Sequence, residues 1–284
     1  MDYGIVMFAT DYALRPGEVA REVEQRGFES LWFPEHTHIP TSRLSPWPGG
    51  AALPKEYSHT HDLFIALSMA AAATTTLKVG SGICLVVERD PIILAKEVAT
   101  LDFLSRGRFL FGIGGGWNAE EMANHGTDFT QRWKVLRERV EAMKAIWQQD
   151  EAEYHGATVS FDPLWSYPKP VQKPHPPVYL GGHGAKALDR VVRYCDGWMP
   201  IPMQSRALLD EIADLRRRAA AAGRDPQSLA VTLYGVPADA DRLREFAAAG
   251  VTRAIFALPP VARDKALPLL DRYQSVVTEL RAHP

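Results

Sequence analysis

The chain has 284 residues, of which 46% are hydrophobic and 23% charged, as in an ordinary soluble protein. Its 32 Lys and Arg residues nearly balance its 34 Asp and Glu residues, and no run of five basic residues occurs, so we expect neither nucleic acid nor a membrane as a partner. Asp2 stands where a signal peptide would be basic, and the weakly polar run at residues 66–73 is too short to span a bilayer, so we expect a cytoplasmic protein.

Short apolar segments alternate along the chain with longer amphipathic ones, a pattern typical of repeated βα units. The predicted strands are residues 4–8, 30–36, 78–86, 108–116, 177–182, 196–201, 229–235 and 253–258. The predicted helices are residues 16–26, 61–76, 91–105, 131–148, 185–194 and 206–222, with one more after each of the last two strands. Eight units in a chain of this length predict one (β/α)8 barrel, a TIM barrel, as a single domain over residues 1–284.

Two long segments interrupt this alternation and are expected as insertions in the barrel. Residues 37–60, rich in Pro, Gly and Ser, follow the second strand and therefore lie on the face where barrels carry their active sites. We expect them to form part of a substrate wall. Residues 151–176, between the fourth helix and the fifth strand, predict a hairpin around His155 and Gly156 that starts from the opposite face.

The fourth strand ends in a glycine-rich segment, residues 112–118. Glycine allows a backbone to approach a flat or anionic ligand closely, so Gly114, Gly115, Gly116 and Trp117 are candidate cofactor-binding residues. Gly114, Gly116 and Ala119 also match a dinucleotide-binding pattern, but that pattern should open the first βα unit and here it closes the fourth. A third interpretation is a turn that only lets the chain leave the barrel.

A second glycine cluster, comprising Gly181, Gly182, His183 and Gly184, joins the fifth strand to its helix. Free N–H groups at the start of a helix favour phosphate, so we expect the phosphate side of a flavin-like cofactor here. The alternative is a plain turn of left-handed residues.

Histidine and glutamate residues follow the second strand. His36 is the candidate acid or base because imidazole titrates near neutral pH, whereas the neighbouring Glu35 points to the other face if the strand continues. A hydrogen-bonded wall histidine is the alternative. His38, His59 and His61 do not complete a convincing ligand set, so we expect no metal.

Two further expectations concern packing. Cys84 and Cys195 lie in apolar segments without paired spacing, which predicts buried free thiols. The alanine-rich helix at residues 61–76 has small side chains that allow close packing, either on the barrel or on a second subunit. We expect a homodimer.

Several blocks resemble the bacterial luciferase-like monooxygenase superfamily, and the later ones its deazaflavin-dependent branch. They are residues 27–32, 35–36, 90–91, 95–97, 99–102, 105–108, 112–118 with Glu121, 181–184 and 196–198. The resemblance implies a (β/α)8 barrel that holds coenzyme F420, or FMN in sibling branches, across its mouth. It also implies that His36 is the active-site histidine and that a cis peptide bond joins Gly82 to Ile83 behind the ring. The alternative for Gly82 is that it only makes room for neighbouring side chains, with every bond trans.

Two positions depart from the sugar-phosphate dehydrogenases of this superfamily. Trp117 stands where they carry a catalytic Glu, and Pro40 stands where they carry a Trp. We therefore expect a different activity, in which hydride passes between F420 and a small, apolar or aromatic organic substrate. The substrate class is suggested by the aromatic residues of the candidate walls: Trp47, Tyr57, Trp117, Trp165 and Trp198. The alternatives are an FMN-dependent monooxygenase supplied by a separate reductase and a non-catalytic flavin-binding protein.

Overall fold

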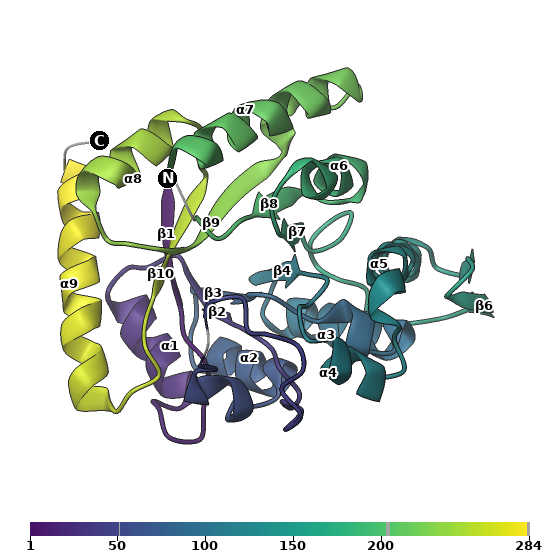
Figure 1. Cartoon of the computed structure of the whole chain (residues 1–284), viewed down its shortest axis with the longest axis horizontal. Helices are drawn as coiled ribbons and strands as arrows, with labels where there is room; N and C mark the ends of the chain where they lie inside the picture. Colours follow the sequence, from purple (N-terminus) through teal and green to yellow (C-terminus); the bar gives the residue numbers. More distant parts are fainter. Residues whose placement is uncertain (51, 203–204, 283–284) are drawn as a thin grey trace.

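The structure, a computed structural model, describes residues 1–50, 52–202 and 205–282, and eight parallel strands form a closed barrel in it (Figure 1). In pairing order they are β1 (Asp2–Val6), β10 (Arg253–Ala257), β9 (Ala230–Val236), β8 (Gly197–Met199), β7 (Val178–Gly181), β4 (Phe109–Ile113), β3 (Lys78–Ser81) and β2 (Ser30–Phe33), which pairs with β1 again. The predicted (β/α)8 barrel is confirmed.

Helices lie around the outside of the strands in chain order (Figure 1). They are α1 (Pro16–Gln25), α2 (Leu63–Ala72), α3 (Pro91–Leu104), α5 (Arg132–Gln148), α6 (Ala185–Tyr194), α7 (Ser205–Ala221), α8 (Ala240–Ala248) and α9 (Arg263–Ala282). No helix in the described ranges is long and apolar enough to cross a membrane.

Most strand residues are apolar and buried, because barrel strands are covered on both faces. All five residues of β4 are buried, and Phe109 and Phe111 are fully inaccessible. Trp147 of α5 packs edge-on against Phe111 and donates its Nε1–H to the carbonyl of Ala95 on α3 at 2.9 Å. This contact links two helices to the barrel through one side chain.

Most predicted strands are longer than the observed ones, and the third shows why. It was predicted to reach residue 86, but β3 ends at Ser81 and a 3-10 helix, η2, forms at Val86–Glu88. The N–H of Leu85 donates to the carboxylate of Glu35 at 2.6 Å instead of continuing a strand ladder. The same loop carries the cis peptide bond between Gly82 and Ile83, so that prediction is confirmed.

Two smaller elements complete the barrel. The predicted hairpin is present as β5 (Ala152–His155) and β6 (Ser160–Leu164), which pair antiparallel. A short helix, α4 (Ala119–Asn124), was not predicted, although Asn118 caps it by accepting the N–H of Glu121 at 3.2 Å. Cys84 and Cys195 are both buried and unpaired, as predicted.

Candidate active site

A cavity of about 290 Å³ opens at the ends of β3, β4, β7, β8 and β9. Seven of the ten predicted cofactor-binding residues line it: Gly82, Ile83, Gly114, Gly115, Gly116, Gly181 and Gly182. The remaining wall comes from four residues that the sequence did not single out: Trp133, Met199, Ile201 and Tyr234. Their only sequence signal was position, since Met199, Ile201 and Tyr234 stand at the carboxyl ends of predicted strands. We call this space the ring cavity.

The glycines of the ring cavity make it open and flat. A Cβ atom on Gly114 would lie 2.5 Å from Cδ1 of Ile83, and one on Gly115 would lie 2.9 Å from the ring of Trp133. Gly116 has a φ of +67°, which L side chains rarely adopt. Larger residues at these positions would therefore clash with Ile83 and Trp133, which line the same cavity. An apolar slot edged by bare backbone suits a planar ring, so the residues present fit a flavin or deazaflavin.

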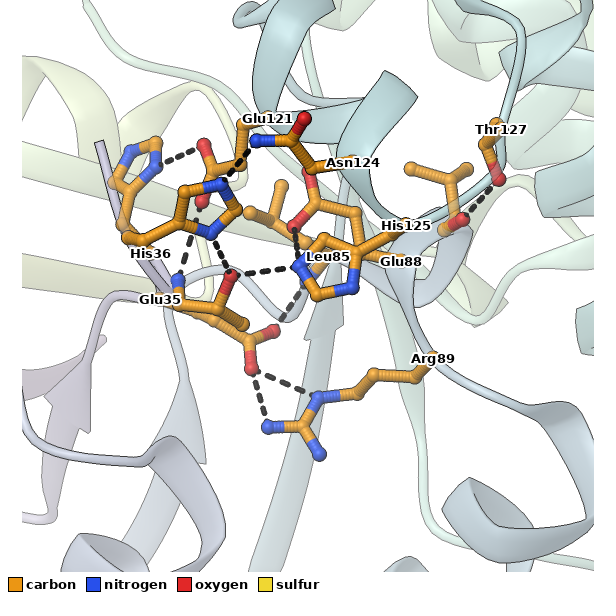
Figure 2. A network of polar contacts seen from close by, with 12 residues as sticks. Glu35, His36, Leu85, Glu88, Arg89, Glu121, Asn124, His125 and Thr127 are labelled. Atoms are coloured by element: carbon orange, nitrogen blue, oxygen red, sulfur yellow. Dashed lines mark hydrogen bonds and ion pairs between the residues drawn. The ribbon is translucent and has the colours of Figure 1, made fainter. Parts of the chain in front are cut away.

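His36 and Glu121 form a buried pair next to this region (Figure 2). His36 Nδ1 lies 2.7 Å from Glu121 Oε2, and the two side chains are only 7% and 1% exposed. When Glu121 is ionised, the hydrogen on Nδ1 is donated to it, which leaves Nε2 to accept or release a proton. Glu121 belongs to the unpredicted helix α4, so its role as the partner of His36 was missed, although it was part of the family-like block.

Aromatic side chains surround His36 and define an aromatic cluster of Trp47, Tyr57 and Trp117. The ring centroids of Tyr57 and Trp117 lie 5.1 and 5.7 Å from that of His36, and Trp47 lies 5.8 Å from Tyr57. Trp47 and Tyr57 come from the insertion at residues 37–60, which α4 anchors because Glu120 accepts the N–H of Ser45 at 2.9 Å. The insertion therefore lies beside the candidate catalytic residue, where the substrate wall was expected.

Two other aromatic candidates for the substrate wall lie elsewhere. Trp165 is 79% exposed beyond the hairpin. Trp198 is fully buried in the core and donates its Nε1–H to the carbonyl of Gly182 at 2.8 Å. Neither residue lines the ring cavity: side chains alternate along β8, so Met199 faces the cavity and Trp198 does not, and Trp165 is exposed after the hairpin.

Two more carboxylates are buried behind His36. Glu35 forms an ion pair with Arg89, whose Nη2 lies 2.5 Å from Oε1. Glu88 has a 1% exposed side chain, and its nearest cationic or titratable contact is His125 Nε2, 3.8 Å from Oε2. Burial, followed by the charges of Glu121 and Glu35, raises the pKa of Glu88 to about 9. Burial also lowers the pKa of His125.

The turn at residues 181–184 has left-handed glycines, Gly182 with φ +122° and Gly184 with φ +78°. The N–H of Gly184 already donates to Oε1 of Glu211 on α7 at 2.8 Å, and His183 Nδ1 lies 3.2 Å from Oε2 of Glu211. A carboxylate therefore occupies the start of α6, the place expected for a phosphate. His183, Gly184 and Trp117 are the three predicted cofactor-binding residues that do not line the ring cavity.

A basic groove of about 380 Å³ adjoins the ring cavity between α5 and α6. It is lined by Trp133, Lys134, Arg137, Asp189, Arg190, Arg193 and Tyr194. Trp133 borders both spaces, and the guanidinium of Arg190 stacks 4.0 Å from its ring centroid. Asp189 is paired with Arg218 at 2.5 Å, so the acid in the groove is already neutralised.

The groove also holds buried polar atoms without a hydrogen-bond partner in the described part of the chain. They are the buried hydroxyl of Tyr194 and Nε of Arg137. No group of three His, Cys, Asp or Glu residues with metal-binding geometry occurs among the described residues.

Comparison with known proteins places this chain in a family. A profile of luciferase-like monooxygenases matches residues 12–276. An uncharacterised protein of Mycobacterium tuberculosis is 42% identical over 279 residues, which cover 96% of this chain and 97% of that protein. An FMNH2-dependent dimethylsulfone monooxygenase of Pseudomonas putida is 32% identical over 155 residues, 54% of this chain and 42% of that protein.

The fold comparison agrees with the sequence comparison. An F420-dependent secondary alcohol dehydrogenase, solved in complex with an F420–acetone adduct, superposes with a TM-score of 0.78 at 20% identity and covers 99% of both chains. Because the profile spans nearly all of the barrel, the chain belongs to the luciferase-like monooxygenase family.

Proposed function

We propose that the chain is an oxidoreductase that binds coenzyme F420 in the ring cavity and transfers hydride between it and a small organic substrate. The observation that carries this proposal is the ring cavity itself, an apolar slot bordered by glycine backbone and close to a buried His–Glu pair. The bound cofactor would supply the hydride chemistry, and the protein would supply binding, orientation and a proton.

In this proposal His36 is the catalytic residue and Nε2 is the atom that moves a proton. Glu121 orients the ring through Nδ1 and stabilises the protonated form. Trp47, Tyr57 and Trp117 bind an apolar or aromatic substrate and exclude water from it. Gly82, Ile83 and Gly114 to Gly116 would hold the cofactor ring, since they line the ring cavity.

The basic groove supports F420 over FMN. F420 extends beyond its phosphate into a chain of carboxylates, whereas FMN ends at its phosphate. Lys134, Arg190 and Arg193 make no ion pair among the described residues and border a groove that starts at the ring cavity. Guanidinium groups bind carboxylates in a bidentate manner, so the groove suits the longer anionic cofactor.

Two alternatives remain testable. An FMN-dependent monooxygenase with a separate reductase is favoured by the 32% identity to the Pseudomonas putida enzyme. A non-catalytic flavin-binding protein would use the same cavity without turnover. Titration of the purified protein with F420 and with FMN decides the cofactor, and steady turnover of carbonyl or alkene substrates with reduced F420 separates enzyme from binder. Micromolar FMN binding without F420 binding would overturn the proposal.

We also propose that the protein is a single-domain cytoplasmic homodimer. Exposed apolar side chains gather on α2 and α3: Ile65, Met69, Ile92, Ile93, Phe103 and Leu104. An apolar face of this kind is typical of a contact surface, since water disfavours it in a monomer. Analytical ultracentrifugation tests the dimer, and a charged substitution at Phe103 should produce the monomer.

A further inference from the structure

Three carboxylates are buried near His36, and two of them form hydrogen bonds with a cation or an imidazole. Glu35 is paired with Arg89 through two nitrogens at 2.5 and 2.8 Å. Glu121 accepts from His36 at 2.7 Å and from the backbone N–H of Thr37 at 3.1 Å. These two groups are therefore stabilised as carboxylates by their contacts.

Glu88 has only a long contact with the imidazole of His125, which is beyond hydrogen-bond distance (Figure 2). Its Oε2 is buried without a hydrogen-bond partner in the part of the chain that the structure describes, and His125 Nε2 is 3.8 Å away. Burial, followed by the charge of His38, lowers the pKa of His125 and so disfavours its charged form. An ionised carboxylate in this position would be desolvated next to two other carboxylates, which is unfavourable.

We propose that Glu88 is a positioning residue that remains a neutral carboxylic acid while His36 works, so that Glu121 acts on His36 as the only unneutralised carboxylate of the cluster. One charge on Glu121 holds the hydrogen on His36 Nδ1 and directs Nε2 to the substrate. A second charge on Glu88 would repel Glu121 and favour proton uptake by the His36–Glu121 pair. This inference rests on the proposed role of His36 in proton transfer.

The coupling is electrostatic rather than a proton relay. Thr37 Oγ1 lies 2.8 Å from His125 Nε2, which continues the contact from Glu88 toward the site. The next link is the backbone N–H of Thr37, which donates to Glu121 Oε1. An amide N–H does not pass a proton on, so Glu88 acts through its charge.

Among the residues that the structure describes, no Lys or Arg pairs with Glu88, and the nearby charge of Arg89 lowers its pKa by less than burial raises it. The charged and titratable groups that face it or contact its partners are Glu35 after β2, His38, Arg89, Asp90, Glu97 of α3, Glu121 of α4, His125 and Arg139 of α5. Arg89 is committed to Glu35, Asp62 and Glu97, and Arg139 Nη1 donates to the carbonyls of Val86 and Arg89 at 2.9 and 2.8 Å.

A route for proton exchange exists on the side away from the substrate. Glu88 and His125 border a polar cavity of about 400 Å³ that also reaches Arg139 and the strand β6. Water in this cavity can exchange the proton of Glu88 without passing the aromatic cluster. Glu88 can therefore titrate in the folded protein.

The test is a pH titration of the protein labelled with ¹⁵N-histidine, in which NMR follows both ring nitrogens of His36. In the wild type, the His36 shifts should show a second inflection where Glu88 ionises, above pH 8. Glu88→Gln, which keeps a neutral side chain of the same shape, should superpose on the wild type below that pH and lose the second inflection. Glu97→Gln, the same chemical change on a partly exposed carboxylate, should keep it.

Two outcomes would overturn the inference. If Glu88 were ionised at neutral pH, the His36 shifts of Glu88→Gln would differ from those of the wild type below pH 8, because the substitution would remove a negative charge. If Glu88 were only structural, the wild type would show no second inflection. Both outcomes are measured by NMR on the protein without substrate or cofactor. Failure of the proposed function is a different result, namely unchanged turnover in a His36 variant.

Discussion

The two sides of the candidate site are built in opposite ways. The ring cavity is made by omitting side chains, with glycine backbone at the ends of rigid barrel strands. The side around His36 is made by burying three carboxylates, which lie after β2, on the 3-10 helix η2 and on the short helix α4. In the proposed function, shape selects a planar ring on the first side, and electrostatics set the proton chemistry on the second. Substitutions should therefore affect binding on one side and pH dependence or turnover on the other.

The largest effect is expected for His36. His36→Ala removes the proposed proton-transferring group and should lower turnover by about 10²–10⁴-fold, the usual contribution of a general acid or base. The substitution also removes the hydrogen-bond partner of Glu121. His36→Asn is therefore the companion variant, since its amide can still donate to that carboxylate. His38→Ala is the control, because His38 contacts Thr37 and Asn124 rather than Glu121. Turnover within about threefold of wild type in correctly folded His36→Asn would contradict the catalytic role.

A second prediction concerns the stability of the charged side. Because the pKa of Glu88 is raised to about 9 in the folded protein, the folded state holds a proton that the unfolded chain loses above its ordinary pKa. This group therefore lowers stability as pH rises between those two values, by up to about 1.4 kcal/mol per pH unit. Glu88→Gln should unfold in urea with a weaker loss of stability from pH 6 to pH 8 than the wild type. An unchanged slope would show that Glu88 is ionised in the fold.

The sequence predicted the ring side better than the charged side, and the reason is physical. A glycine cluster at the end of a predicted strand is visible in a few consecutive residues, so Gly114 to Gly116 and Gly181 to Gly182 could be predicted as cavity residues. The pair of His36 and Glu121 joins residues 85 positions apart through a six-residue helix, and short helices have little periodicity to detect. The lengths of most strands were also overestimated. A side-chain acceptor such as Glu35 can take the place of a neighbouring strand as hydrogen-bond partner, and hydropathy does not change where this happens.

On the ring side, the basic groove should discriminate between cofactors. Arg190→Gln combined with Arg193→Gln should weaken F420 binding roughly tenfold at low salt, which corresponds to about 1.4 kcal/mol. FMN binding should change less, because FMN has no carboxylate chain to reach the groove. Arg217→Gln, an exposed arginine on α7 paired with Asp214, is the control. Fluorescence titration at two salt concentrations checks this prediction, since screening by salt should reduce the difference in F420 affinity between the wild type and the double variant. Equal losses for both cofactors would place only the phosphate in the groove.

The smallest effect is expected at the start of α6, where a carboxylate lies in the place proposed for the cofactor phosphate. Glu211 accepts the N–H of Gly184 at 2.8 Å, so a phosphate that approaches residues 181–184 meets a negative charge and an occupied donor. Glu211→Gln removes the charge while its amide oxygen can still accept, and should tighten binding of F420 and FMN a few-fold. Riboflavin, which lacks the phosphate, is the matched ligand and should bind equally to both proteins. If Glu211→Gln instead weakens F420 and FMN binding, the phosphate lies elsewhere and the Glu211 contact serves to order the turn beside the ring cavity. The glycine slot would then be retained as the ring site, with the basic groove as the remaining position for the anionic end of the cofactor.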